Sequence, residues 1–268
     1  MENNALCKFN PPTEQIEYCF FETLNSTHAF ALNQNWYGRL NDKKVVVIFV
    51  AQQTEGQGTH SRIWCSSGED FHINFVFLLD KALPFSQIAA FTACQFLNRL
   101  TENNFRFQLK WPNDIYVAGH KIGGCLSHVR NNNDRIWVTV GVGLNFNLSE
   151  EVAKTIDQPV ISLKTLLNNT EDYPTSELFK HVQTFSELFV QNLHWYRQAG
   201  MEHFFNDALP FWLYHHEKIR VYNEDRKQWW HGTFEAVDAH GALVLKSGEK
   251  NLRTVLNGTQ LEREKDSR

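Results

Sequence analysis

Two lysines near the middle of the chain stand where they could bind anions. Lys110 opens the segment Lys-Trp-Pro-Asn-Asp at residues 110–114, and Lys121 follows it, shortly before a pair of glycines. Fixed cations of this kind bring acidic reactants together and stabilise a transferring phosphoryl group. Asp114 could orient an amine, accept its proton or place a metal ion, and it could also do no more than close a turn. The residue types therefore indicate chemistry on anions.

Strands must position these lysines. Apolar and polar residues alternate over 105–111 with the period of two that is typical of a strand, and Pro, Asn and Asp then favour a turn before extended structure resumes at 115–117. On the strand that follows, strict alternation places Lys121 on the same face as Gly123. We therefore expect a lysine beside a glycine on one face of this strand.

The next strand has an unusually bare face. Over residues 136–147, apolar side chains alternate with a second set that includes Gly141, Gly143 and Asn145. Missing side chains are typical of a sheet where a flat ligand lies close to the backbone. The alternative is that these glycines mark bulges or tight crossings.

A polar loop at 52–64 follows the continuous apolar run of 44–50, which is typical of a buried strand. This position makes the loop a candidate for ligand binding, although it could be only a connection. Trp64 could stack on a flat ring, or it could belong to the core. Upstream, Ser26 or Thr27 is predicted to cap a helix over 28–36.

The rest of the chain predicts packing elements. Residues 71–79 alternate as a strand, and helices are expected from 84 to about 102 and from 174 onward, the second with a single apolar stripe. Short strands separated by turns between 218 and 255 indicate a small barrel. His215 and His216 lack a third ligand at suitable spacing, so we expect solvated side chains there and no metal site.

Taken together, the segment at 110–114, Lys121 with its two glycines, and Gly-Val-Gly-Leu-Asn at 141–145 resemble the catalytic core of biotin protein ligases. The resemblance covers nearly the whole chain. It implies an α+β fold: a class II synthetase-like catalytic domain at 1–212, with a mixed, mostly antiparallel sheet and packed helices, and a small SH3-like β-barrel at 213–268.

The same resemblance implies a two-step reaction. The biotin carboxylate attacks the α-phosphorus of ATP to give biotinyl-5′-AMP and pyrophosphate, and a lysine of a biotin carboxyl carrier domain then attacks the adenylate and releases AMP. The implied site residues are these: Lys121, Asp114, Lys110 and Arg62 for catalysis; Ser26, Thr27, Gln53, Gly56, Lys121, Gly123, Gly124, Gly141 and Gly143 for biotin; Gln57, Gly58, Arg62, Trp64, Lys110, Asn113, Lys121 and Asn145 for ATP and the adenylate.

Two departures from the family pattern stand out. His28 occupies a position where the family usually has Asn beside Ser26 and Thr27. In the polar loop, Gln57 and Thr59 replace common arginines, which leaves Arg62 as the permanent cation of the loop, with His60 nearby. Because Gln and Thr cannot replace the charge of an arginine fork, we expect weaker retention of the adenylate or more reliance on Mg²⁺ and the two lysines.

Composition agrees with an ordinary cytoplasmic enzyme. The formal net charge is −4 and no basic nucleic-acid footprint is present. Five scattered cysteines without a CxxC pair favour a reducing compartment, and we expect no membrane span, no direct metal ligation beyond Mg²⁺ carried by ATP, no DNA-binding module, and a monomer or homodimer. Alternatives are a lipoate or octanoate ligase, a non-catalytic biotin-binding regulator, and a nucleotide-binding interaction protein.

Overall fold

The computed structural model describes residues 16–36, 39–40, 44–59, 62–132, 135–248, 251–256 and 258–264. The expectations for the segment before residue 16, and for His60, lie outside these residues. In the described part of the chain, no helix is long and apolar enough to cross a membrane.

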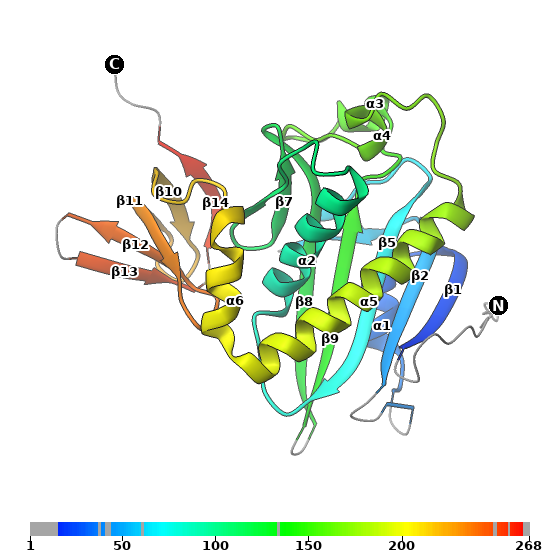
Figure 1. Ribbon diagram of the computed structural model, residues 1–268, viewed down its shortest axis with the longest axis horizontal. Helices are drawn as coiled ribbons and strands as arrows, with labels where there is room; N and C mark the ends of the chain where they lie inside the picture. Colours follow the sequence, from blue (N-terminus) through cyan, green and yellow to red (C-terminus); the bar gives the residue numbers. More distant parts are fainter. Residues whose placement is uncertain are drawn as a thin grey trace.

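A seven-stranded sheet forms the centre of the molecule (Figure 1). Only the pair at one edge, β1 and β2, is parallel, and each other neighbouring pair is antiparallel. The predicted mixed, mostly antiparallel α+β fold is therefore confirmed. Across the sheet the strands are β1 (Ile16–Leu24), β2 (Val45–Gln53), β5 (Glu69–Leu79), β9 (Arg135–Leu144), β8 (His120–Asn132), β7 (Asp114–Val117) and β6 (Gln108–Lys110).

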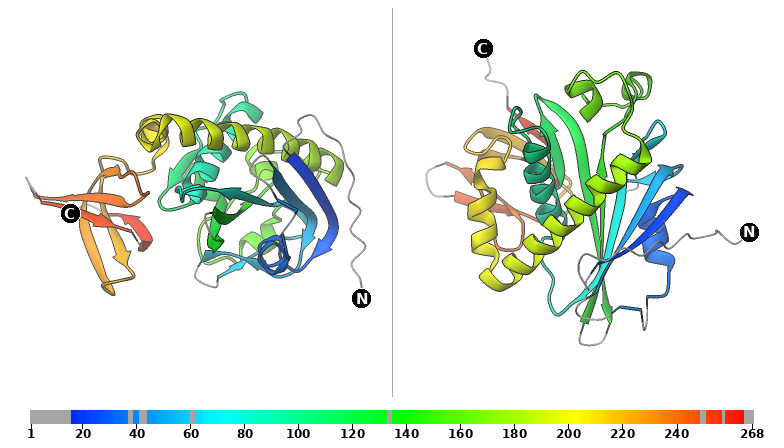
Figure 2. Two further views of the ribbon diagram at one scale, coloured as in Figure 1. Left: turned by 90° about the horizontal axis from the view of Figure 1, so that it is seen from below. Right: turned by 45° about the vertical axis from the view of Figure 1, so that its right-hand side comes forward.

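Two helices, α2 (Phe85–Leu100) and α5 (Thr175–Ala199), cover one face of this sheet (Figures 1 and 2). The apolar stripe of α5 meets the alternating apolar residues of β5, and the rings of Phe75 and Phe189 lie 4.4 Å apart between centroids. Burying such aromatic surface is the main stabilising contribution to a core of this kind. Helix α1 (Thr27–Asn33) and the site described below lie on the opposite face of the sheet.

Two predicted elements are shorter in the structure. Helix α1 ends at Asn33, and Trp36 lies beyond it with its indole N–H donating to the Ala31 carbonyl at 2.7 Å. Ser26 caps this helix, since its hydroxyl oxygen accepts the Ala29 N–H at 3.3 Å. Strand β6 covers only 108–110, although alternation predicted a strand from 105. Periodicity located these elements but not their ends, which depend on packing.

The smaller elements carry loops and connections. Strands β3 (Gly56–Gln57) and β4 (Ile63–Trp64) form a short hairpin, α3 (Glu150–Ala153) and α4 (Leu163–Leu166) follow β9, and α6 (Met201–Ala208) with the 3₁₀ turn η2 (Leu209–Phe211) leads out of α5. The last strands form a separate antiparallel sheet (Figure 2). Its order is β13 (Asn251–Val255), β12 (Leu243–Ser247), β11 (Gln228–Val237), β10 (Lys218–Asn223) and β14 (Gly258–Arg263).

Candidate active site

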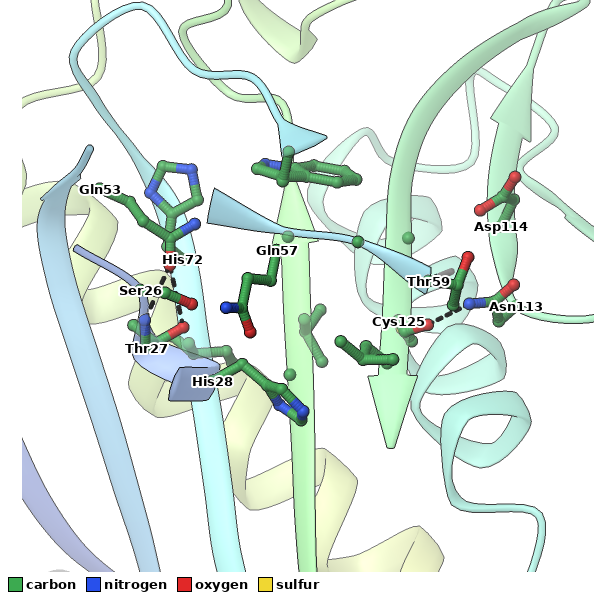
Figure 3. Close-up of a pocket in the computed structure, with 18 of the residues that line it drawn as sticks. Ser26, Thr27, His28, Gln53, Gln57, Thr59, His72, Asn113, Asp114 and Cys125 are labelled. Carbon is green, nitrogen blue, oxygen red and sulfur yellow. Dashed lines mark hydrogen bonds between the residues drawn. The ribbon is translucent and has the colours of Figure 1, made fainter. Parts of the chain in front are cut away.

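Two neighbouring cavities open on the sheet face that α2 and α5 leave uncovered. The first chamber lies between α1, β5, β9 and β8, and Figure 3 shows its lining. The second chamber lies between β4 and the segment 156–160. Four residues line both chambers, namely Gly58, Thr59, Trp64 and Lys121. The predicted central lysine therefore stands at the boundary between two spaces.

Lys121 is held at this boundary through its backbone and its side chain. Its N–H donates to the Pro159 carbonyl at 2.9 Å, and its carbonyl accepts the Ile161 N–H at 3.0 Å. Its Nζ lies 2.7 Å from Oδ1 of Asp114 and 5.7 Å from the centroid of the Trp64 ring. The ammonium is thus positioned over an aromatic face and neutralised by one carboxylate, a pairing that the sequence did not predict.

The glycine that accompanies Lys121 on the site face is Gly124, so the predicted face of Gly123 is wrong. A Cβ on Gly124 would meet Asp114, Trp64 and Lys121, whereas one on Gly123 would lie 2.5 Å from Cδ2 of the core residue Leu144. The reason is a register shift in the pairing of β7 and β8, where Lys121 opposes Tyr116 and Gly123 opposes Ile115. A bulge inserts one residue and reverses the alternation that follows.

Gly141 and Gly143 do lie on the site face of β9, and both line the first chamber. The indole of Trp64 lies directly on one of them: a Cβ at Gly143 would be 2.7 Å from Cε2 and Cζ2 of the ring. A Cβ at Gly124 would be 3.3 Å from Cζ3 of the same ring. The bare strand face thus receives a flat ring that belongs to the protein itself.

Ser26, Thr27 and Gln53 lie together in the first chamber, as predicted (Figure 3). The Thr27 N–H and hydroxyl both donate to Oε1 of Gln53, at 2.8 and 3.2 Å. This arrangement leaves the Gln53 amide N–H₂ and the Ser26 O–H as donors, and the Thr27 hydroxyl oxygen as an acceptor. A small neutral ring with donors and acceptors would match these groups.

The polar loop forms the β3–β4 hairpin, with the Gly58 N–H donating to the Arg62 carbonyl at 2.8 Å. Gln57 and Thr59 line the first chamber, and Arg62 lines the second. Gly56 lines neither; it packs inside the hairpin, where a Cβ would lie 2.5 Å from the Trp64 carbonyl oxygen. Its role is close backbone approach rather than direct contact with either chamber.

Three further predicted residues differ in their relation to the two chambers. Lys110 lines neither chamber; its Nζ lies 5.0 Å from the Tyr116 ring centroid, and burial lowers its pKa while Asp114 acts against that shift. Asn113 lines the first chamber and donates to the Cys125 carbonyl, which ties the turn to β8. Asn145 lines the second chamber and donates to the Ile161 carbonyl at 3.3 Å.

Sequence reasoning missed two histidines and an asparagine on this face. His72 and Asn74 alternate with Phe71, Ile73 and Phe75 on β5, so the polar half of that strand was the available signal. His28, previously noted only as a departure, accepts from the Asn74 amide at 3.0 Å through Nδ1. Burial lowers the pKa of His28 and of His72 to about 4, so both rings are neutral near pH 7.

His215 and His216 lie outside both chambers. Their rings are 3.7 Å apart between centroids, and His215 Nε2 is 3.1 Å from the Glu235 carbonyl oxygen. The expectation of a solvated pair is therefore wrong for His215, which is half-buried against the C-terminal sheet. Among the residues that the structure describes, no group of three or more His, Cys, Asp or Glu side chains could hold a metal ion.

Comparison with known proteins places biotin protein ligases among the relatives of this chain. Residues 20–145 match the model of the biotin/lipoate A/B protein ligase family. The chain is 22% identical over 222 residues to the bifunctional ligase/repressor BirA of Escherichia coli, covering 80% of this chain and 66% of that protein. The chain is a homologue of the biotin protein ligases. The resemblance inferred from its motifs is confirmed.

Another relative and a solved structure agree with this homology. BirA of Bacillus subtilis is 28% identical over 131 residues, which cover 47% of this chain and 38% of that protein. The biotin protein ligase of Aquifex aeolicus, solved with biotin and ATP, superposes with a TM-score of 0.71 at 20% identity, over 94% of this chain and all of that one. The chain thus has a biotin ligase-like fold. It spans two thirds or less of the length of these two BirA proteins.

Proposed function

We propose that this protein is an ATP-dependent ligase that activates biotin as biotinyl-5′-AMP and transfers it to a lysine of a biotin carboxyl carrier domain. One observation carries the proposal: the Lys121 ammonium stands between two chambers that share it. The first chamber suits the biotin ring and tail, and the second suits the nucleotide. A cation at their junction can bind a carboxylate from one side and the α-phosphate from the other.

In the first step, a carboxylate oxygen of biotin forms a bond to the α-phosphorus of ATP, and the bond from that phosphorus to the β-phosphate oxygen breaks. Lys121 offsets the repulsion between the two anions, and Arg62 contacts phosphate oxygens from the second chamber. Trp64 stacks on the adenine after its ring adjusts on Gly143. Mg²⁺ would arrive with the nucleotide and neutralise the leaving pyrophosphate.

In the second step, the amine of the carrier lysine attacks the acyl carbon, and the bond to the AMP oxygen breaks. The attacking amine must be neutral, and a lysine begins with a pKa of about 10.4. Asp114 is the carboxylate closest to Lys121, at 2.7 Å. When Lys121 turns to the bound anions, the Asp114 carboxylate is released to orient the amine and accept its proton.

We further propose a division of the chain at residue 212, with the catalytic domain before it and an SH3-like domain after it. The five-stranded antiparallel C-terminal sheet supports this division. A carrier domain is the proposed partner, because the acyl group must leave the chamber on a protein lysine. Cys65, Cys94 and Cys125 are free thiols, which supports a cytoplasmic location.

Isotope exchange between pyrophosphate and ATP tests the first step. We expect exchange that depends on biotin, and a loss of at least about a hundredfold in Lys121→Ala with its fold retained. Lys164→Ala is the matched control, since Lys164 pairs with Asp172 at 2.6 Å outside both chambers. Exchange with lipoate or octanoate in place of biotin would favour the lipoate-type alternative, and biotin binding without exchange would favour a non-catalytic regulator.

A further inference from the structure

The His72 imidazole is a buried polar group in the wall of the first chamber. It is 1% exposed, and in the described part of the chain neither Nδ1 nor Nε2 has a hydrogen-bond partner. The ring belongs to β5 and lines the chamber, beside Gln53 in Figure 3, and both of its nitrogens are buried. Because buried polar groups in folded proteins nearly always have a partner, an imidazole without one needs a reason for its presence.

The residues paired with His72 on the two neighbouring strands have no side-chain group that could hydrogen-bond it. His72 pairs with Val50 on β2 and with Gly143 on β9, so it stands between an apolar side chain and a missing one. The nearby polar groups form contacts of their own and do not bond the imidazole: Thr27 donates to Gln53, and the Asn74 amide donates to His28. The hydrogen-bonding capacity of His72 is therefore left for whatever enters the chamber.

The chemistry of the ring restricts that occupant. Burial lowers the pKa of His72 to about 4, so the ring is neutral near pH 7 and offers one donor and one acceptor. A neutral imidazole suits a neutral group that also has both, such as a cyclic urea. A carboxylate is better served by Lys121 at the chamber boundary, and an aliphatic or disulfide-containing ring would leave the imidazole unpaired.

We propose that His72 is a specificity-determining residue that hydrogen-bonds the ureido ring of biotin through a ring nitrogen. This inference rests on the proposed function, because it assigns the ring end of biotin to the first chamber. It explains why the chain keeps a buried imidazole that the free protein leaves unpaired. A site of this kind discriminates strongly against a ligand that lacks the hydrogen-bonding group.

Equilibrium binding of biotin and of lipoate to wild type, His72→Phe and His72→Gln tests the proposal. Phe keeps a flat ring without nitrogen, and Gln restores a donor and an acceptor. We expect His72→Phe to bind biotin about ten to a hundred times more weakly, and His72→Gln to recover part of that loss. Lipoate affinity should change less than biotin affinity in either variant. His194→Phe, on α5 away from both chambers, is the control and should bind biotin as wild type does.

Two readouts separate this role from a structural one. The melting temperature of ligand-free His72→Phe should equal or exceed that of wild type, since an unpaired buried polar group is removed. The ¹⁵N resonances of His72, assigned by their absence in His72→Phe, should shift when biotin is added. Biotin affinity unchanged in His72→Phe, or His72 resonances that do not respond to biotin, would overturn the proposal.

These results are distinguishable from failure of the proposed function. Biotin-dependent exchange of pyrophosphate in wild type with unchanged biotin affinity in His72→Phe rejects the role of His72 alone. Wild type that neither binds biotin nor supports exchange rejects the proposed function and, with it, this inference.

Discussion

In the proposed reaction Lys121 acts in the first step and Asp114 in the second, so the ion pair between them must open. In the free protein, Oδ1 of Asp114 neutralises the ammonium at 2.7 Å, and the two side chains are 13% and 24% exposed. A partly buried contact of this kind holds Lys121 at the chamber boundary and prevents it from turning into solvent. Binding of two anions then offers the ammonium stronger partners, which leaves the carboxylate unpaired beside the reacting acyl group.

Replacement of Asp114 by Asn tests that exchange of partners. The variant keeps the shape of the side chain but has no charge to attract or deprotonate an amine. We expect transfer from preformed biotinyl-adenylate to a carrier domain to slow by about a hundredfold, as removal of a general base usually does. Single-turnover transfer measures this, with Asp172→Asn as a control of the same chemistry. A transfer rate equal to that of wild type would limit Asp114 to closing the turn.

His28 predicts a dependence of stability on pH. Burial lowers its pKa from 6.5 to about 4. Between these two pH values, the imidazole is therefore protonated in the unfolded chain and neutral in the folded chain. Its contribution to the free energy of unfolding is fully present above about pH 6.5 and is lost as pH falls toward 4. The loss can reach a few kcal/mol, since one pKa unit corresponds to about 1.4 kcal/mol.

Urea denaturation at several pH values measures this loss. We expect His28→Asn, which has no titrating group, to lose less stability than wild type between pH 6.5 and 4. Equal pH dependence in the two proteins would show that the His28 imidazole is not the group responsible.

At the scale of elements, the sequence predicted which strands form the site but not, for every strand, which residues face it. Unbroken alternation on β9 placed Gly141 and Gly143 on the site face, where the structure has them. On β8 the same reasoning failed for Gly123, because the bulge opposite Tyr116 is not encoded by alternation. The segment 156–161, which pairs with Lys121, carries no periodicity and could be placed only by tertiary contacts.

In the β3–β4 hairpin, two uncharged residues stand where the family resemblance leads us to expect arginines. Gln57 and Thr59 line the first chamber, and neither carries charge. In the double variant Gln57→Arg, Thr59→Arg, two guanidinium groups can each form paired hydrogen bonds with the phosphate of the adenylate. We expect release of biotinyl-5′-AMP to slow by about tenfold, equivalent to roughly 1.4 kcal/mol.

Release is measured by chasing labelled adenylate with an excess of unlabelled adenylate. Thr54→Arg is the control, because it adds the same charge at an exposed position before the hairpin and outside both chambers. Release from the double variant as fast as from wild type would show that charge on this hairpin does not govern retention.

At the scale of the whole molecule, the C-terminal sheet is built onto the turn that follows Lys110. The Gly241 carbonyl accepts the Trp111 indole N–H at 2.9 Å and the Gln87 amide at 2.7 Å. Next to them, the Leu213 N–H donates to the Leu109 carbonyl at 2.7 Å. Leu109 and Trp111, the two neighbours of Lys110 in the chain, thus both contact the C-terminal part of the chain. These contacts fix the position of Lys110.

Gly258 on β14 provides the test of this coupling. A Cβ there would lie 2.8 Å from Cζ3 of Trp111, so Gly258→Ala must push the sheet away from the turn. Overpacking of this kind costs about 1–3 kcal/mol, and we expect lower biotin-dependent exchange and faster proteolysis between 209 and 217. Gly232→Ala is the matched control: its Cβ would lie 2.8 Å from the Lys246 carbonyl, so it strains the same sheet without touching Trp111. If the two variants lose exchange activity equally, general destabilisation of the sheet is responsible. A loss confined to Gly258→Ala would indicate that this contact orients the turn bearing Lys110 for catalysis.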